Sequence, residues 1–444
     1  MRKSSFHTIL VILVSLLFIL SSGPQPVTAT NVWYFNVNSF EDINDDILNS
    51  VCSVGEVTGG PCTLRGAIAE ANAIIDTFDI VIDLPAGDYD LAIPPEGING
   101  INSGDLNFQG DDSPHSITLR CTDLQPAVID ANLLDRVIRV ELGAVVNLEN
   151  IVVRGGLLSW TGSVDFHDGA GILNYGKTSL TNVVVENNEA RCGQENCDSM
   201  YISGGGILNA GEMVIADSMI RNNKSVAASA IMNAGGSGGV VIKNSTIYDN
   251  QATEAFTISS YSYLHIRNST VSRNTADPSY ILGIANNDFL ILESTTIANA
   301  GTISSIYNSS DGTVRIKDSI LANFGNPGGG NCMNNGTWIS DGYNIYSDNS
   351  CPSTGTGDLM NTDPQLGVLG YWGGPTLTLP LQTGSPAEDH RPGVCMTIPE
   401  GPILPPDELI EDQRHFSRDD GACDTGAFEG IFDLLPVYLP LVVK

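Results

Sequence analysis

The chain has 444 residues, of which 51 are acidic and 20 are basic, so its formal net charge at neutral pH is −31. This charge argues against nucleic acid and anionic lipid as partners, and a polyanionic sugar would bind only through cations. It suits a solvated extracellular surface, or one that binds calcium loosely. No other cofactor and no metal site is expected.

The first 29 residues have the pattern of a secretory signal peptide. Arg2 and Lys3 precede the apolar run from Ile9 to Leu20, and Val27-Thr28-Ala29 provides a small-residue cleavage site. This run of 12 residues is too short to cross a bilayer. We therefore expect a secreted protein, extracellular or on the cell surface, with no transmembrane span once residues 1–29 are removed.

Residues 30–78 are predicted to cap the front of the domain that follows. Apolar side chains recur at helical spacing from Thr63 to Ile75, which is typical of an amphipathic helix. The apolar run from Asp79 to Leu84 then predicts a buried strand. It opens a domain that we place at residues 79–345.

One short pattern occurs seven times between residues 146 and 324. The pattern begins with an apolar, a polar and a second apolar residue. A polar anchor lies two residues after the second apolar residue, and a third apolar residue lies three residues after the anchor. The anchors are Asn150, Asn182, Asp217, Asn244, Asn268, Ser294 and Asp318, at steps of 32, 35, 27, 24, 26 and 24 residues. Repeats of this length are typical of a solenoid, in which each coil buries its apolar face against its neighbours.

Inside each repeat, apolar and polar residues alternate, and the apolar positions are rich in Val and Ile, which favours strands. Ile172-Leu173-Asn174 and its later copies indicate a second strand in each coil, since glycine and asparagine interrupt any helix there. The sequence therefore predicts an all-β parallel β-helix with coils about 4.8 Å apart. Its inward column is predicted to be Leu148, Leu180, Ile215, Ile242, Ile266, Leu292 and Ile316.

Asparagine is frequent in the turn after the last apolar position, as in Asn187-Asn188 and Asn222-Asn223. Asparagine tolerates left-handed backbone angles, and its amide can bond the same amide one coil away, so these residues predict turns and ladders. Glycosylation is the alternative, because Asn223, Asn244, Asn268 and Asn335 each begin a formal sequon.

All nine cysteines follow residue 29, and eight form local pairs: Cys52 with Cys62, Cys192 with Cys197, Cys332 with Cys351, and Cys395 with Cys423. Export permits disulfides, and short loops without neighbouring histidines argue against zinc. Cys121 is left over at an inward position. It is predicted to be a buried thiol rather than a nucleophile.

Residues 346–430 lose the repeat and are rich in Pro, Gly and Cys, which predicts an irregular C-terminal cap. Residues 431–444 form an apolar tail that carries Pro436 and Pro440. A plain terminal strand is the simpler interpretation of this tail, and the alternative is its similarity to short C-terminal tails on exported proteins of filamentous green bacteria.

The two end regions resemble a known family. Cys62-Thr63-Leu64-Arg65-Gly66-Ala67 is similar to the CSLREA motif of secreted bacterial β-helix proteins, with Thr63 and Gly66 in place of its serine and glutamate. The tail resembles the choice-of-anchor Q domain through Asp363-Pro364-Gln365-Leu366-Gly367, Gly373-Gly374-Pro375-Thr376, Gly384-Ser385-Pro386-Ala387, Asp412-Gln413-Arg414 and Asp424-Thr425-Gly426-Ala427-Phe428-Glu429. The resemblance implies a right-handed, single-stranded, pectin-lyase-like β-helix exported to the cell surface, with no established chemistry.

Two functions remain open at this stage. Right-handed β-helices include polysaccharide lyases and glycoside hydrolases, and such enzymes need clustered or paired carboxylates. The charged column Arg154, Glu186 and Arg221 alternates in sign, which is also the pattern of a surface ion ladder worth about 0–1 kcal/mol per pair.

We therefore assign no catalytic residue and expect surface display, adhesion or carbohydrate binding, with a carbohydrate-active enzyme as the second hypothesis. Glycans or cell-surface components are the expected partners. Insertions in a solenoid often gather on its binding face. The candidate contact residues therefore lie in the long coils around residues 160–200: Trp160, Asp165, His167, Asp168, Glu186 and Glu189.

Overall fold

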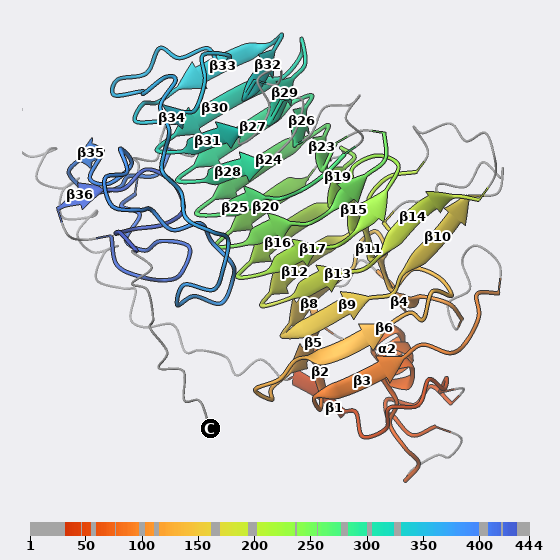
Figure 1. The fold of residues 1–444 in the computed structure, drawn as a ribbon. Coiled ribbons are helices and arrows are strands. Elements are labelled where there is room, and N and C mark those ends of the chain that lie inside the picture. The colour runs from red at the N-terminus through yellow and green to blue at the C-terminus, as the bar shows by residue number, and fades with distance from the viewer. Residues whose placement is uncertain are drawn as a thin grey trace, which may run out of the picture.

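The computed structural model describes residues 32–45, 47–54, 59–75, 77–96, 103–110, 115–160, 169–193, 202–235, 238–254, 256–276, 283–299, 304–323, 330–398, 407–418 and 421–432. Most of these residues form a right-handed parallel β-helix, as predicted, with strands from successive coils aligned in long sheets (Figure 1). This part of the chain contains no helix with the length and apolar character that a membrane span requires.

Three long parallel sheets form the walls of the solenoid. The first sheet contains β1 (Val32–Asn36), β2 (Asp79–Leu84), β5 (Ile117–Cys121), β8 (Val145–Glu149), β12 (Lys177–Thr181), β16 (Glu212–Ala216), β20 (Gly239–Lys243), β24 (Tyr263–Arg267), β27 (Phe289–Glu293), β30 (Thr313–Lys317) and β33 (Thr337–Ser340). The second contains β4 (Leu106–Phe108), β7 (Ile138–Val140), β11 (Ile172–Asn174), β15 (Ile207–Asn209), β19 (Ile231–Asn233), β23 (Ile258–Ser260), β26 (Ile284–Asn286), β29 (Ile306–Asn308) and β32 (Cys332–Asn334).

The third sheet carries the candidate site. It contains β3 (Gly87–Asp90), β6 (Ala127–Asp130), β9 (Ile151–Arg154), β13 (Val184–Glu186), β17 (Met219–Arg221), β21 (Thr246–Tyr248), β25 (Thr270–Ser272), β28 (Thr296–Asn299), β31 (Ile320–Asn323) and β34 (Ile345–Tyr346). A short fourth sheet follows it in four coils, formed by β10 (Leu157–Trp160), β14 (Glu189–Cys192), β18 (Lys224–Ser225) and β22 (Gln251–Ala252). The antiparallel pair β35 (Arg391–Pro392) and β36 (Ala422–Cys423) lies outside the solenoid.

The predicted inward column is confirmed. Its seven residues pair in register from coil to coil in the first sheet, and each is fully buried. All seven polar anchors have positive φ angles, between 44° and 55°, at the corner where the chain passes from the first sheet to the third. Asparagine, aspartate and serine occupy these turns because their short polar side chains tolerate the left-handed conformation.

Buried asparagines form the predicted ladders. At the end of the third sheet, the side-chain amide of Asn188 donates to Asn223, which donates to Asn250, each at 3.0 Å. A second ladder begins where Asn174 donates to Asn209 at 2.7 Å. The sequon residue Asn223 is therefore part of the architecture, since its side chain is fully buried and paired.

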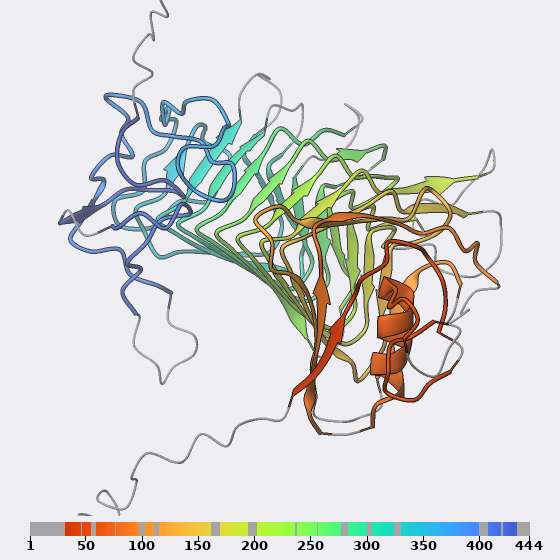
Figure 2. The ribbon, with the colours of Figure 1, turned by 90° about the horizontal axis from the view of Figure 1, so that it is seen from below.

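A helix covers the first coils, as predicted. In α2 (Leu64–Ala73), the Thr63 hydroxyl caps the helix by accepting from the Gly66 amide at 3.1 Å. Arg65 is buried; its Nε lies 2.6 Å from the Asp42 carboxylate, and Nη2 donates to the Gly104 carbonyl at 2.9 Å. Figure 2 shows α2 at the end of the solenoid formed by the N-terminal coils. Thr63 and Arg65 thus supply a helix cap and a buried ion pair, both structural features.

Disulfides join three of the pairs named above, Cys52–Cys62, Cys332–Cys351 and Cys395–Cys423. Cys192 is also disulfide-bonded, and Cys197 lies outside the described residues. Cys121 is a free, buried thiol, as predicted, with Sγ 3.3 Å from the Gln125 carbonyl.

The chain after the last coil does more than close the end of the solenoid. Leu359 bridges to Ile345, so the residues just after β34 do stack on the last coil. Residues 363–398, 407–418 and 421–432, which we call the C-terminal segment, instead fold back along the side of the solenoid (Figure 1). They lie over the corner between the first and third sheets, where the polar anchors are.

The C-terminal segment binds directly to the repeat anchors. Four anchors contact it: Asp217 through His415, Asn244 through Thr376, Asn268 through Arg418 and Asp318 through Arg391. Leu379, Leu381 and Phe428 pack on Ala298 and Ile320 of the third sheet. The anchors therefore serve two purposes, since they turn the chain and also offer polar groups to the segment.

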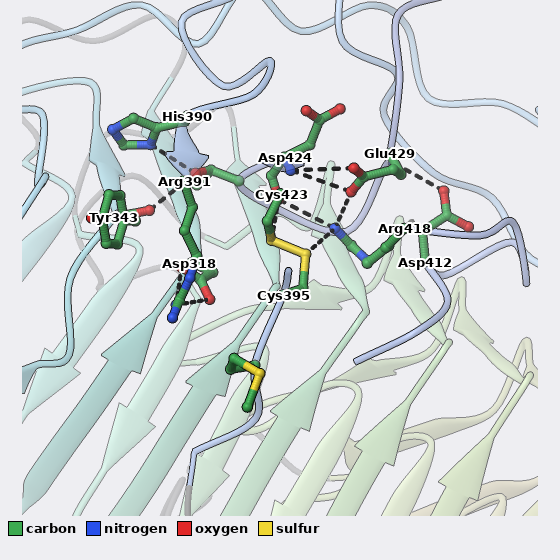
Figure 3. Close-up of a disulfide and its surroundings, with 12 residues drawn as sticks. Asp318, Tyr343, His390, Arg391, Cys395, Asp412, Arg418, Cys423, Asp424 and Glu429 are labelled. Atoms are coloured by element: carbon green, nitrogen blue, oxygen red, sulfur yellow. Dashed lines mark hydrogen bonds and ion pairs between the residues drawn. A yellow bond between two sulfur atoms is a disulfide. The ribbon is translucent and has the colours of Figure 1, made fainter. Parts of the chain in front are cut away.

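Buried charged side chains stabilise the docked C-terminal segment. Arg418 is 1% exposed; its Nη1 lies 2.6 Å from the Glu429 carboxylate and its Nη2 donates to the Asn268 side chain at 3.2 Å. Figure 3 shows Arg418 beside the disulfide between Cys395 and Cys423, with Asp318 and Arg391 paired nearby. Because a buried charge is costly without a partner, each of these groups depends on the docked arrangement.

One of the docking contacts is predicted to depend on pH. The imidazole of His415 lies between Asp217, at 2.7 Å, and Glu411, at 3.0 Å. Partial burial lowers its pKa, but the hydrogen bonds and charges of the two carboxylates outweigh burial, so the pKa is raised above 6.5. Protonated His415 therefore stabilises the folded protein. This contribution is complete at pH values below the pKa of His415 in the unfolded state, and it is lost as the pH rises through the higher pKa of the folded state.

We expect His415→Gln to lower the melting temperature at about pH 5.5 and to have a smaller effect at about pH 8.5. His390→Gln is the control, because burial lowers the pKa of His390 and its contribution therefore weakens toward acid pH instead. Differential scanning calorimetry of both variants across this range checks the prediction. An effect of His415→Gln that does not change with pH would contradict it.

Candidate functional site

The outer face of the third sheet changes character along the solenoid. Alternate residues of its strands point inward and are buried, among them Ile129, Val153 and Val185. The outward residues at the strand ends align in register from one coil to the next: Asp130, Arg154, Glu186, Arg221, Tyr248, Ser272, Ala298 and Ala322. The early coils thus carry charged residues at this position, and the later coils carry uncharged ones.

The C-terminal segment accounts for this change. Gln413 bonds to Thr246 and Thr270, and Leu381 and Phe428 cover the face beyond them, so the small outward residues there are buried. The hydroxyl of Tyr371 lies 3.5 Å from the sulfur of Met219 and marks the edge of the covered part. The strand-end residues of the third sheet are therefore partly exposed from Asp130 to Arg221, a stretch that we call the open half of the sheet, and they are buried from Tyr248 to Ala322.

Arginine–carboxylate pairs occupy the open part. Arg154 Nε donates to Asp130 at 2.7 Å, and its Nη2 lies 3.5 Å from Asp88. Arg221 Nε donates to Glu186 at 2.6 Å. The predicted ion ladder is thus present between Glu186 and Arg221, whereas Arg154 pairs with the preceding coil. The side chain of Arg154 is about one third exposed. We therefore expect its ion pairs with Asp130 and Asp88 each to contribute at most about 1 kcal/mol to the stability of the folded protein.

The pKa of each of these two arginines is raised above its ordinary value, in part by hydrogen bonding. The pKa of Arg154 is raised chiefly by its hydrogen bond to Asp130. For Arg221, burial lowers the pKa, but the hydrogen bond to the Tyr248 hydroxyl and the charge of Glu186 outweigh burial and raise it. Both guanidinium groups therefore stay cationic at every pH of interest and act as fixed hydrogen-bond donors.

A depression of about 410 Å³ lies at the carboxyl ends of β6, β9 and β13. It is lined by Asp130, Asn132, Leu133, Arg154, Gly155 and Asn187. Since parallel strands end at the same edge of a sheet, three successive coils contribute to one hollow. We call it the Arg154 pocket.

The structure places only part of the candidate set from the sequence. Trp160 ends β10, but its side chain and residues Asp165, His167 and Asp168 lie outside the described residues. Glu186 ends β13 and is paired with Arg221, while Glu189 begins β14 in the fourth sheet, 3.9 Å from Arg191. Glu186 lies one residue before Asn187, at the border of the Arg154 pocket.

Sequence reasoning missed most of the pocket. Asp130, Asn132 and Leu133 precede the first recognised repeat, in a coil whose pattern Ala127-Val128-Ile129-Asp130 has the same inward and outward alternation. Comparing that strand with Val152-Val153-Arg154 would have aligned Asp130 with Arg154. In the described residues, no group of three or more His, Cys, Asp or Glu side chains is arranged to hold a metal ion.

Comparison with known proteins gives a structural neighbour only. No family model and no curated protein matches the chain. A solved structure of pectate lyase Pel9A aligns with 91% of this chain and 97% of its own, at 13% sequence identity and a TM-score of 0.42. A likeness at this level carries no information about ligand or activity, which must come from the chain's own side chains.

Proposed function

We propose that this chain is an exported cell-surface β-helix protein of the CSLREA and choice-of-anchor Q family, which binds carbohydrate or another surface component without catalysis. The basic and apolar start of the chain and its disulfides support export. The family motifs coincide with structural contacts, since Arg65 fixes the capping helix and Gln413 and Arg414 lie in the docked segment.

The observation that carries the proposal is the open half of the third sheet. It offers a flat array of side chains with a hollow at one edge, next to the coils with the long insertions. Asp130, which lines the pocket, and Glu186, which precedes the lining residue Asn187, are each held by an arginine. A carboxylate engaged in this way is poorly placed to exchange a proton with a substrate, whereas the array as a whole can present donors and acceptors to a ligand.

Binding and turnover can be measured on the same preparation. The exported protein is applied to a glycan array and to insoluble polysaccharides, and the bound fractions are then tested for new reducing ends and for unsaturated products. We expect binding without turnover. Release of products would support the polysaccharide lyase or glycoside hydrolase alternative, and a protein that binds no glycan and does not attach to cells would contradict the proposal.

Deleting residues 160–168 tests the contribution of the first insertion. We expect this deletion to abolish attachment while the far-ultraviolet circular dichroism of the β-helix is unchanged, because insertions on one face of a solenoid commonly carry its contacts. Deleting residues 277–282, between β25 and β26, is the control. Attachment that survives the first deletion would exclude residues 160–168 as an essential part of the contact surface and leave the third sheet or the C-terminal segment to carry it.

A further inference from the structure

The rim of the Arg154 pocket contains a strained apolar residue. Asn132 and Leu133 are consecutive residues with positive φ angles of 52° and 60°. Leucine seldom adopts this conformation, because its Cβ approaches the following carbonyl. Leu133 is also 59% exposed, so burial of its side chain does not compensate for the strain. Strain of this kind persists where surrounding bonds impose it, and it is concentrated at functional sites.

Those surrounding bonds are present. The Leu133 amide donates to the Gly155 carbonyl at 2.8 Å, and the Asn132 amide donates to Asp130 Oδ1 at 2.9 Å. The Asn132 side chain donates to the Leu91 carbonyl at 3.0 Å. The turn is therefore tied to the coils on both sides of it, and it holds an exposed apolar side chain beside the arginine.

Free polar groups surround this leucine. Arg154 uses Nε on Asp130 and Nη2 on Asp88, and its Nη1 forms no hydrogen bond among the described residues. The side-chain amide of Asn187 and the Oδ1 atom of Asn132 are likewise without partners in that part of the chain. The pocket thus combines unpaired donors, unpaired acceptors and an apolar contact.

The charge of the pocket selects among ligands. Asp88 and Asp130 face one guanidinium, so the immediate surroundings carry a net negative charge. A uronate, sulfate or phosphate group would meet both carboxylates at close range and be repelled. Neighbouring hydroxyls of a neutral sugar can accept from Arg154 and donate to the amide oxygens of Asn132 and Asn187, while a C–H face of the ring packs on Leu133.

We propose that the Arg154 pocket is a subsite for one neutral sugar residue of a glycan chain. This inference rests on the proposed carbohydrate binding and specifies its ligand class and its location. Leu133 provides the apolar contact in a conformation that costs the protein stability, and Asn187 and Arg154 provide hydrogen bonds to ring hydroxyls.

Calorimetric titration of the full exported chain with cellohexaose, mannohexaose, xylohexaose and hexagalacturonate tests the assignment. We expect at least one neutral hexasaccharide to bind and hexagalacturonate not to bind. Asn187→Ala is expected to weaken that binding about tenfold or more. Asn222→Ala is the matched control, because Asn222 occupies the same turn one coil later, with the same φ of 54°, outside the pocket.

Leu133→Gly separates a ligand contact from a structural role. Glycine adopts a positive φ without strain, so this variant is expected to melt at a higher temperature while it binds the same sugar about tenfold more weakly. Hexagalacturonate that binds more tightly than the neutral sugars and is lost in the same variants would overturn the ligand class alone. Neutral-sugar binding that neither variant changes would overturn the location. Failure of every glycan to bind would contradict the proposed function as well.

Discussion

Replacing Ile242 with aspartate is expected to destabilise the solenoid by more than about 3 kcal/mol. Ile242 is fully buried in the middle of the inward column, between Ile215 and Ile266 on the neighbouring strands. The variant loses apolar contacts with both coils and places a carboxylate where no partner is available. Chemical denaturation followed by circular dichroism measures the loss.

Val214→Asp provides the comparison for that experiment. Val214 lies on the adjacent strand β16 of the same sheet, but it points outward and is 39% exposed. We expect this variant to stay within about 0.5 kcal/mol of the parent. Equal stabilities for the two aspartate variants would show that the inward and outward assignments of the first sheet are incorrect.

The second large effect is expected in the docked C-terminal segment. Arg418→Met removes the cation that pairs with Glu429 and leaves that carboxylate buried without its ion-pair partner Arg418. Breaking a buried ion pair from one side typically costs about 3–5 kcal/mol. Because the pair joins parts of the segment and Arg418 also bonds Asn268, we expect the segment to detach and become sensitive to protease before the coils unfold.

A double variant distinguishes loss of charge from loss of packing. Arg418→Met combined with Glu429→Gln leaves no buried charge at this pair, so it is expected to be more stable than Arg418→Met alone. Arg273→Ala controls for arginine removal in general, since its pair with Asp249 is exposed and contributes little. A double variant that is less stable than the single one would mean that the Glu429 carboxylate stabilises the segment through other contacts, such as the Asp424 amide, and not mainly through Arg418.

Much of the fold follows from the sequence because it is repeated. The alternation around each polar anchor identified the strands of the first sheet, the inward column and the turn chemistry, and all three agree with the structure. The buried Cys121 thiol and the capping helix also followed from local patterns. Local periodicity is sufficient here, since each coil contacts mainly its neighbours.

Long-range contacts were harder to predict. At the strand position that carries charged residues in the early coils, the later coils carry Tyr248, Ser272, Ala298 and Ala322. Uncharged residues that point outward from a sheet indicate that another part of the chain covers them. Which segment covers them could not be inferred, because the C-terminal segment contacts coils more than a hundred residues earlier in the chain. The Arg154 pocket was missed for a similar reason, since its residues come from three coils and belong to no common motif.

The central claim is that ligands bind to the open half of the third sheet. Hydrogen–deuterium exchange of the full chain, with and without a glycan that the array identifies, tests it most directly. We predict slower exchange on binding at residues 128–134, 152–156 and 184–187, and no change in the covered strands from residue 246 to 323. Slower exchange confined to the C-terminal segment or to the first sheet would contradict the claim.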